Sequence, residues 1–306
     1  MAETRLNLIT GAFSYSGKYV ARKLLARGER VRTLTGHPDR ADPFNGKVEV
    51  FPYRFESMAE LAKSFEGVEV FYNTYYIRFP YGSTTYELAY ENNKKLIQAA
   101  KQAGVRRIVN ISITNPSPDS KFPYFRYKYM IDQAAIGSGI SCAIIRPTVI
   151  FGHEDILINN IAWLLRRLPV MAMPGKGDYK IQPIYVEDQA DIMIEAADRK
   201  ENLIWDAVSA DTFTFKEMVK LIRSKIPSLT LFILPTPPEL FLLASKLMNP
   251  LLGDVILTRD EVYGLMENLL YSREPPRGKT RLADWLEQNK DWIGKKYASE
   301  LKRHYR

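Results

Sequence analysis

Short apolar runs alternate with amphipathic helical patterns through the first half of the chain. Strands are predicted at Leu6–Ile9, Val31–Leu34, Lys47–Phe51, Val68–Tyr72, Arg107–Ile111 and Ser141–Ile145. Helices are predicted at Lys18–Arg27, Ala59–Phe65, Tyr86–Ala103 and Tyr124–Ile136. Strands that alternate with helices usually form parallel sheets with helices on both faces. The pattern therefore predicts an α/β fold with a doubly wound parallel sheet.

The pattern loosens after Arg146-Pro147-Thr148. A short strand is predicted at Gln182–Tyr185, and helices at Asn159–Arg167, Phe215–Ser224, Glu239–Met248, Thr258–Leu269 and Arg281–Arg303. The helix at Glu239–Met248 is unusually apolar, which suits core packing, a cap over a cleft, a dimer contact or contact with a membrane surface. We expect residues 1–150 to form the sheet domain. Residues 151–306 are expected to form a smaller, mainly helical substrate region, with the chain free to cross between the two.

Composition narrows the classes of protein that need to be considered. Of the 306 residues, 46% are hydrophobic and 25% are charged, which excludes wholesale disorder. The single cysteine, Cys142, excludes an internal disulfide and favours a reducing compartment. No run of about 18 apolar residues is present, and the first predicted strand leaves no room for a signal peptide. We therefore expect a cytoplasmic protein without a membrane span.

The net charge of +8 is unevenly distributed. Residues 271–306 hold ten Lys and Arg against five Asp and Glu. A basic chain is compatible with nucleic acid, anionic lipid or phosphate ligands. In this segment the charges alternate with Trp285, Trp292 and Tyr297 in a pattern typical of an amphipathic helix. We interpret it as a packing and surface element, expect no nucleic-acid partner, and keep peripheral membrane contact as a minor alternative.

A candidate phosphate-binding loop joins the first predicted strand to the first predicted helix. It runs from Gly11 to Gly17, with Ser14 where a middle glycine is usual. Glycines let backbone amides approach a pyrophosphate, and a helix N-terminus favours the anion. The motif predicts a Rossmann-type nucleotide site, and a tight turn without a ligand is the alternative. Its candidate cofactor-binding residues are Gly11, Phe13, Ser14, Tyr15, Ser16 and Gly17.

The end of the second predicted strand bears on the choice of cofactor. An acid at that position would bind the adenine ribose hydroxyls. Here the position holds Thr35, and His37 and Arg40 follow closely. An uncharged end beside cations suits a ribose 2′-phosphate, which an acid would repel. The sequence thus predicts NADP(H) in preference to NAD(H), unless Arg40 is an ordinary surface residue and either cofactor binds.

Tyr124 and Lys128 form a candidate catalytic pair. Residues four apart share one face of a helix. A lysine ammonium near a phenol favours the phenolate and lowers the pKa of the phenol. The tyrosine can then exchange a proton with a substrate alcohol or carbonyl during hydride transfer. The alternative is a tyrosine packed against a lysine stem.

Taken in order, these features resemble the extended or atypical short-chain dehydrogenase/reductase superfamily, which includes NAD(P)-dependent epimerases and dehydratases. The matching segments are 10–17, 66–70, 99–109, 123–128, 145–152 and 182–188. Residues 151–155, with Asn159 and Gln182-Pro183, are most similar to the branch of the nucleotide-binding accessory subunit of respiratory complex I. The resemblance implies that the chain binds NADP(H), as members of that branch do. It leaves a non-catalytic role open.

The resemblance also implies roles for single residues. Tyr124 would be the general acid and base, and Lys128 would bind the nicotinamide ribose and tune Tyr124. Pro147 and Thr148 would line the nicotinamide pocket.

The superfamily also places a Ser or Thr hydroxyl after the fifth strand. Here Ile113 stands near that position, flanked by Ser112 and Thr114. Because alternate residues of a strand share a side, either hydroxyl remains a candidate for the catalytic set. Two departures bear on the cofactor geometry. The stretch 73–76 replaces a small-residue turn, and Arg54 replaces an acid that often contacts adenine.

Aromatic residues gather in the sequence around the expected cleft, which suggests an apolar or aromatic small-molecule substrate. The candidate substrate contacts are Tyr75, Tyr76, Asn159 and Gln182. The three histidines (His37, His153 and His304) lack metal-ligand spacing, so no metal site is predicted.

The leading hypothesis is an NAD(P)-dependent oxidoreductase in which Tyr124 and Lys128 assist hydride transfer on an alcohol or carbonyl. One alternative is a non-catalytic NADP(H) sensor or an accessory subunit of a membrane-associated complex. Another is a sugar-nucleotide epimerase or dehydratase, which oxidises and re-reduces its substrate in one turnover. A homodimer is compatible with each of these hypotheses.

Overall fold

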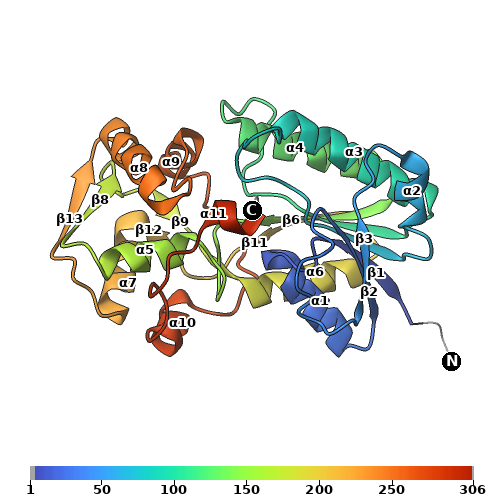
Figure 1. Ribbon diagram of the computed structural model, residues 1–306, viewed down its shortest axis with the longest axis horizontal. Helices are drawn as coiled ribbons and strands as arrows, with labels where there is room; N and C mark the ends of the chain where they lie inside the picture. The colour runs from blue at the N-terminus through green and yellow to red at the C-terminus, as the bar shows by residue number, and fades with distance from the viewer. Residues whose placement is uncertain (1–3, 305–306) are drawn as a thin grey trace. The chain divides into compact units, whose positions relative to one another are not determined.

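The computed structural model describes residues 4–304, and the chain divides into two compact units. The first consists of Met1–Pro147 with Val186–Ala207, and the second of Thr148–Tyr185 with Val208–Arg306. Residues 186–207 therefore belong to the first unit, although the sequence places them in the region 151–306. The helices and strands of each unit are labelled in Figure 1.

A seven-stranded, fully parallel sheet forms the centre of the first unit. Its strands stand in the order β11-β6-β5-β4-β1-β2-β3. Their bounds are β1 (Leu6–Thr10), β2 (Arg30–Thr35), β3 (Val48–Pro52), β4 (Val70–Asn73), β5 (Arg107–Ile111), β6 (Ser141–Pro147) and β11 (Leu203–Ala207). Six of these strands lie where the sequence predicts them to within a few residues. The doubly wound α/β prediction is confirmed.

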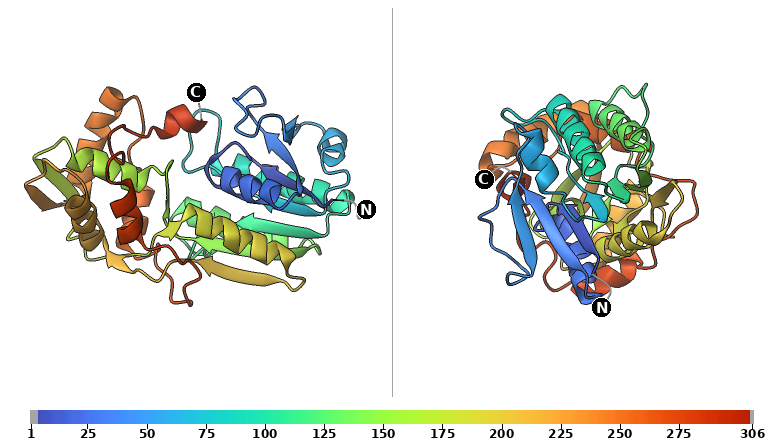
Figure 2. Two further views of the ribbon diagram at one scale, coloured as in Figure 1. Left: turned by 90° about the horizontal axis from the view of Figure 1, so that it is seen from below. Right: turned by 90° about the vertical axis from the view of Figure 1, so that its right-hand side faces the viewer.

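Helices cover both faces of this sheet (Figures 1 and 2). On one face lie α2 (Met58–Lys63), α3 (Tyr86–Gln102) and α4 (Pro123–Ile136), and on the other lie α1 (Tyr15–Ala26) and α6 (Val186–Asp198). Successive side chains of a strand point to opposite faces of the sheet, so each strand packs against both layers of helices. Leu8, Phe71 and Ile108 pack with Leu96 of α3 in one buried cluster. With both faces covered, the central strands are largely buried, and most of their side chains are apolar.

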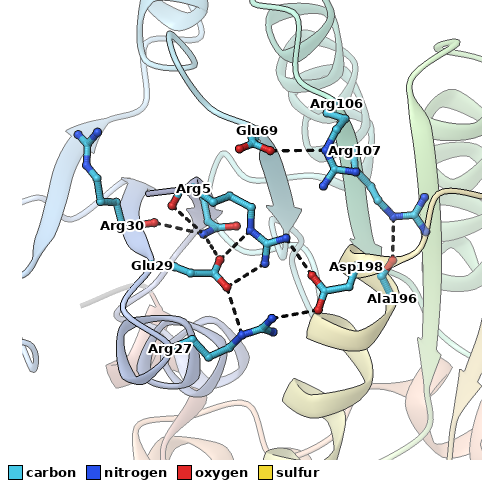
Figure 3. Close-up of polar contacts among 10 residues, drawn as sticks. Arg5, Arg27, Glu29, Arg30, Glu69, Arg106, Arg107, Ala196 and Asp198 are labelled. Carbon is cyan, nitrogen blue, oxygen red and sulfur yellow. Dashed lines mark hydrogen bonds and ion pairs between the residues drawn. The ribbon is translucent and has the colours of Figure 1, made fainter. Parts of the chain in front are cut away.

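Ion pairs link neighbouring elements at the amino-terminal ends of the sheet strands (Figure 3). Arg5, just before β1, pairs with Glu29 at 2.7 Å and with Asp198 at the end of α6 at 2.9 Å. Arg27 joins the same two acids. Arg107, which begins β5, is fully buried and donates to the carbonyl oxygen of Ala196 at 2.7 Å. These contacts fix α6 to the sheet and leave the opposite, carboxyl edge for a ligand.

The second unit is smaller and mainly helical, as predicted. Its strands are β7 (Ile150–Phe151), β8 (Val170–Pro174), β9 (Lys180–Ile181), β10 (Ile184–Tyr185), β12 (Phe213–Thr214) and β13 (Phe232–Thr236). Its helices are α5 (Leu157–Leu165), α7 (Phe215–Lys225), α8 (Pro238–Leu252), α9 (Arg259–Met266), α10 (Leu282–Asn289) and α11 (Glu300–His304). Its core packs Ile161, Met218, Ile222 and Trp285 together.

The prediction of one helix over Arg281–Arg303 is wrong in its middle. The chain forms α10, then a non-helical stretch at 290–299, then α11. Gly294 has a φ of +71°, and a Cβ there would lie 2.5 Å from the carbonyl carbon of Ala162 in α5. The loop is thus pressed against α5, and this tertiary contact overrides the local helical pattern.

Candidate functional site

The loop from Gly11 to Gly17 folds back on itself at the start of α1. Gly11 has a φ of +73°, which suits glycine, and its carbonyl oxygen accepts from the Ser14 amide at 2.8 Å. A Cβ on Gly17 would lie 2.3 Å from that oxygen, so only glycine fits. Ser14 takes the N-cap position, but its hydroxyl makes no capping bond. The first amides of α1, including those of Ser16 and Gly17, lack intrahelical acceptors, which suits a pyrophosphate.

Threonine side chains fasten this loop to the sheet. The Thr33 hydroxyl of β2 accepts from the Ala12 amide at 2.9 Å and donates to the carbonyl oxygen of Ile9 at 3.0 Å. Thr10 and Thr74 bond to each other through backbone and hydroxyl groups. The carboxyl ends of β1, β2 and β4 therefore form one support beneath the loop. This geometry fits a dinucleotide with its pyrophosphate at the N-terminus of α1.

The residues predicted to select the cofactor stand in one turn after β2. The Thr35 hydroxyl accepts from the His37 amide at 3.0 Å, and the Arg40 amide donates to the His37 carbonyl at 3.1 Å. Phe13 lies beside Phe44 of the same segment, with ring centroids 6.1 Å apart. The phosphate loop and the segment 35–44 are therefore neighbours, as a nucleotide spanning both requires.

Tyr124 and Lys128 occupy the first turns of α4 and meet a common neighbour, Tyr76. The Lys128 ammonium is buried, donates to the carbonyl oxygen of Ile111 at 2.9 Å and lies 4.1 Å from the Tyr76 ring centroid. The Tyr76 hydroxyl donates to the Tyr124 carbonyl at 3.2 Å, and the two rings pack edge to face. Both residues of the predicted pair thus contact Tyr76, and the Lys128 ammonium lies at the end of β5.

Burial governs the electrostatics of this pair. It lowers the pKa of Lys128, and the nearby carboxylate of Asp132 opposes that shift. Burial raises the pKa of Asp132, which Arg146 and Ser112 oppose. Burial also raises the pKa of Tyr76 well above its usual range, so this phenol stays protonated. The pKa of Lys128 therefore depends on the charges around it.

The two candidate hydroxyls after β5 differ in their surroundings. The amides of Ser112 and Thr114 donate to the carbonyl oxygens of Ile145 and Pro147, so the pairing with β6 continues past the end of β5. Both side chains are buried. The Ser112 hydroxyl donates to Asp132 at 2.8 Å, so its proton is used in a buried hydrogen bond.

Two of the expected substrate contacts have a structural task in the second unit. The Asn159 amide bonds to the backbone of Gly294 and Lys296, and that of Gln182 bonds to the backbone of Ser209 and Ser272. Thr148, expected at the nicotinamide, donates to the Gln182 carbonyl. These contacts favour a packing role for all three side chains.

Tyr75 lies in the first unit among aromatic rings. It packs against Tyr53 and Phe55 with centroids 5.2 and 5.4 Å away, and its hydroxyl accepts from the Asn92 amide at 2.8 Å. Pro147, the other residue expected at the nicotinamide, ends β6.

Sequence reasoning missed a buried polar cluster beneath the pair. It consists of Asn73, Asn93, Asn110, Ser112, Asp132 and Arg146. A signal was present in the spacing, because Asp132 follows Lys128 by four residues and so shares its helix face. The asparagines come from separate elements and carry no such signal.

Comparison with known proteins adds independent findings. Residues 11–156 match the family model described as NAD(P)H-binding. The chain is also 22% identical over 286 residues to the mitochondrial NADH dehydrogenase (ubiquinone) 1 alpha subcomplex subunit 9 of Arabidopsis thaliana, over 86% of this chain and 70% of that protein. Three other curated relatives each match more than half of this chain, and this chain spans 52% to 60% of their length.

Solved structures share the fold of this chain. A nucleoside-diphosphate-sugar epimerase from Staphylococcus aureus superposes with a TM-score of 0.74 at 16% identity, over 92% of this chain and 99% of that one. The Citrobacter triphenylmethane reductase, solved with NADP(H), gives 0.75 at 16% identity, over 93% and 99%. The resemblance to the short-chain dehydrogenase/reductase superfamily and its complex I accessory branch is confirmed. Within residues 4–304, no helix is both long and apolar enough to cross a membrane.

Proposed function

We propose that the protein is an NAD(P)-dependent oxidoreductase that acts on an alcohol or carbonyl group. The observation that carries the proposal is the placement of Tyr124 and Lys128 against Tyr76, beside the end of β5 in the unit that holds the phosphate loop. A nucleotide alone needs the loop and α1, whereas a tyrosine with a buried lysine one turn away is what proton transfer needs.

In this proposal, the bound dinucleotide supplies or accepts the hydride. The start of α1, with Ser16 and Gly17, would hold the pyrophosphate. The Lys128 ammonium would bind the nicotinamide ribose and favour the phenolate of Tyr124. The Tyr124 phenol would give its proton to the carbonyl oxygen during reduction and take it back during oxidation. The rings of Tyr75 and Tyr76 suit an apolar or aromatic substrate.

The preference for NADP(H) is part of the proposal. Thr35, His37 and Arg40 form one turn beside the phosphate loop, and none of them is an acid that would repel a 2′-phosphate. Substituting Arg40→Ala is expected to weaken NADPH binding more than NADH binding. Equal losses would contradict the assignment of Arg40 to the 2′-phosphate.

A non-catalytic NADP(H)-binding role in a larger assembly is the second candidate. It is supported by the Arabidopsis relative, whose name describes a subunit of NADH dehydrogenase. The commitment of the Ser112 hydroxyl to Asp132 also favours it, because one hydroxyl is thereby withdrawn from the catalytic set. Cytoplasmic location stays a prediction, and cell fractionation would test it.

A turnover assay separates the two candidates. NADPH oxidation is followed with a panel of aromatic and aliphatic carbonyls, using the full chain and Tyr124→Phe. We expect one or more substrates to be turned over by the wild type and the variant to lose roughly 10²- to 10⁴-fold in rate with NADPH affinity retained. Tyr127→Phe, which alters an exposed phenol bonded to Glu87, is the matched control. Turnover that survives in Tyr124→Phe would remove Tyr124 from the mechanism.

A further inference from the structure

The buried carboxylate of Asp132, one turn after Lys128 on α4, has no part in the proposed hydride and proton transfer. We propose that Asp132 is a positioning residue for Lys128, supplying the fixed countercharge that keeps the buried ammonium charged and aimed at the active site. This inference rests on the proposed function for its catalytic meaning. The Asp132–Lys128 coupling itself is testable without any substrate.

The carboxylate of Asp132 is held from three sides. The residue is fully buried on α4, one turn after Lys128. Its Oδ2 accepts from the Ser112 hydroxyl at 2.8 Å and from Arg146 at 3.2 Å, and its Oδ1 accepts from the Asn110 amide at 3.1 Å. These donors come from β5, its extension and β6. The carboxylate therefore has a fixed place relative to the sheet.

A chain of buried amides fixes the group further. Asn110 accepts from the Asn73 amide at 2.8 Å, and Asn73 also donates to Asn93 of α3 at 2.7 Å. All three asparagines are buried. The network thus runs from the end of β4, next to Thr74 and the phosphate loop, through β5 to Asp132. Buried polar groups that satisfy one another in this way are costly to rearrange.

The charges around Lys128 give Asp132 its role. Two ionisable side chains lie close to Lys128: Tyr76 after β4, whose ring lies beneath the ammonium, and Asp132, one turn further along α4. Tyr86 of α3 stacks on Tyr76, and β5 contributes the Ile111 carbonyl. Among these groups Asp132 is the one that can carry negative charge near neutral pH. Without it, the buried Lys128 ammonium would lose its opposite charge, which burial penalises strongly.

The same geometry assigns a role to Ser112. Its hydroxyl has a single proton, and that proton is donated to Asp132. Ser112 is thereby part of the support for the carboxylate.

The test is a direct titration of Lys128 in the full chain without cofactor. Lysines are labelled with carbon-13 at Cε, and the signal of Lys128 is identified by its loss in Lys128→Met. We expect Asp132→Asn to move the midpoint of Lys128 down by about one pH unit or more, because it removes an opposite charge. Asp155→Asn, which alters a buried carboxyl of the second unit, is the control and leaves the midpoint in place. An unmoved or raised midpoint in folded Asp132→Asn would overturn the proposal.

The reciprocal variant keeps the test decisive if Asp132→Asn does not fold. Lys128→Met removes a buried cation, and the Asp132 carboxyl is then followed by carbon-13 labelling. We expect its midpoint to rise by an amount similar to the Lys128 shift, since the coupling of two charges is mutual. An unchanged midpoint would contradict the proposal. Failure of the chain to bind NADPH would instead count against the proposed function and leave both titrations valid.

Discussion

At the scale of single residues, the shape of the phosphate loop requires a glycine, which has no side chain, at position 17. At Gly17 the first turn of α1 lies against the carbonyl oxygen of Gly11. Ser14, between the two glycines in the sequence, is the N-cap residue of α1. The missing middle glycine therefore does not prevent the loop from forming. Its amides face the direction from which an anion would approach.

Substituting Gly17→Ala tests this packing. The new Cβ would lie 2.3 Å from the Gly11 oxygen, so either the loop or the helix must shift. We expect the free energy of unfolding to fall by about 1–3 kcal/mol and NADPH binding to be lost. In Gly36→Ala the Cβ would meet only the Tyr53 ring at 3.8 Å, so that variant controls for stability. Equal melting temperatures for the two variants would show that Gly17 is not under steric constraint.

Local spacing predicts some site residues and misses others. The four-residue interval predicts that Tyr124 and Lys128 share a face, because helix geometry alone fixes it. It does not reveal that Asp132, one turn further on, meets Arg146 and Ser112. Those partners come from other strands, and only the folded sheet brings them within hydrogen-bonding distance.

At the scale of elements, the stretch at 290–299 is shaped by its neighbour α5. Asn159 and Asn160 bond to the backbone between 294 and 298, and Arg166 and Arg167 bond to carbonyl oxygens between 290 and 295. These polar side chains, from α5 and from the two residues that follow it, replace the helical bonds that the amphipathic pattern predicts for the segment. Periodicity describes local preference, and it carries no record of these distant donors.

Asn159→Ala separates a structural role from a substrate role. The change leaves the amide of Gly294 and the carbonyl of Lys296 without their partner. We expect the free energy of unfolding to fall by about 2 kcal/mol in chemical denaturation, because buried backbone groups become unsatisfied. The exposed Gln288, substituted by Ala, is the control and changes stability by less than about 0.5 kcal/mol. Full stability in Asn159→Ala would return this residue to the list of ligand contacts.

At the scale of the whole molecule, the chain crosses between its two units. The sequence predicts most of the sheet, since its central strands are buried on both faces and read as apolar runs. It does not predict α6 or β11, which return to the first unit after Tyr185. Asp198 at the end of α6 pairs with Arg5 near the N-terminus, and such an ion pair cannot be identified before the fold is known.

Stability should also depend on pH through a buried acid. Asp155 accepts from the amides of Ile158 and Asn159, while its Oδ2 has no hydrogen-bond partner. Burial raises its pKa to about 7, against the pull of those amides. Between the unfolded pKa of about 3.9 and pH 7 the folded chain holds a proton that the unfolded chain releases, so this contribution to stability declines as pH rises.

We therefore expect Asp155→Asn to melt at a higher temperature than the wild type at pH 8. The difference should shrink towards pH 5, where less of the penalty has developed. Thermal unfolding at both pH values checks the expectation. A difference that grows on acidification would have the wrong sign for a raised pKa.

We infer that the loop from Gly11 to Gly17 binds a nicotinamide dinucleotide beside Tyr124 and Lys128. Calorimetric titration of the full chain with NADPH, and then with NADH, measures this directly. We expect saturable binding of one NADPH per chain, with weaker binding of NADH. Absence of binding by both nucleotides in the folded protein would contradict it.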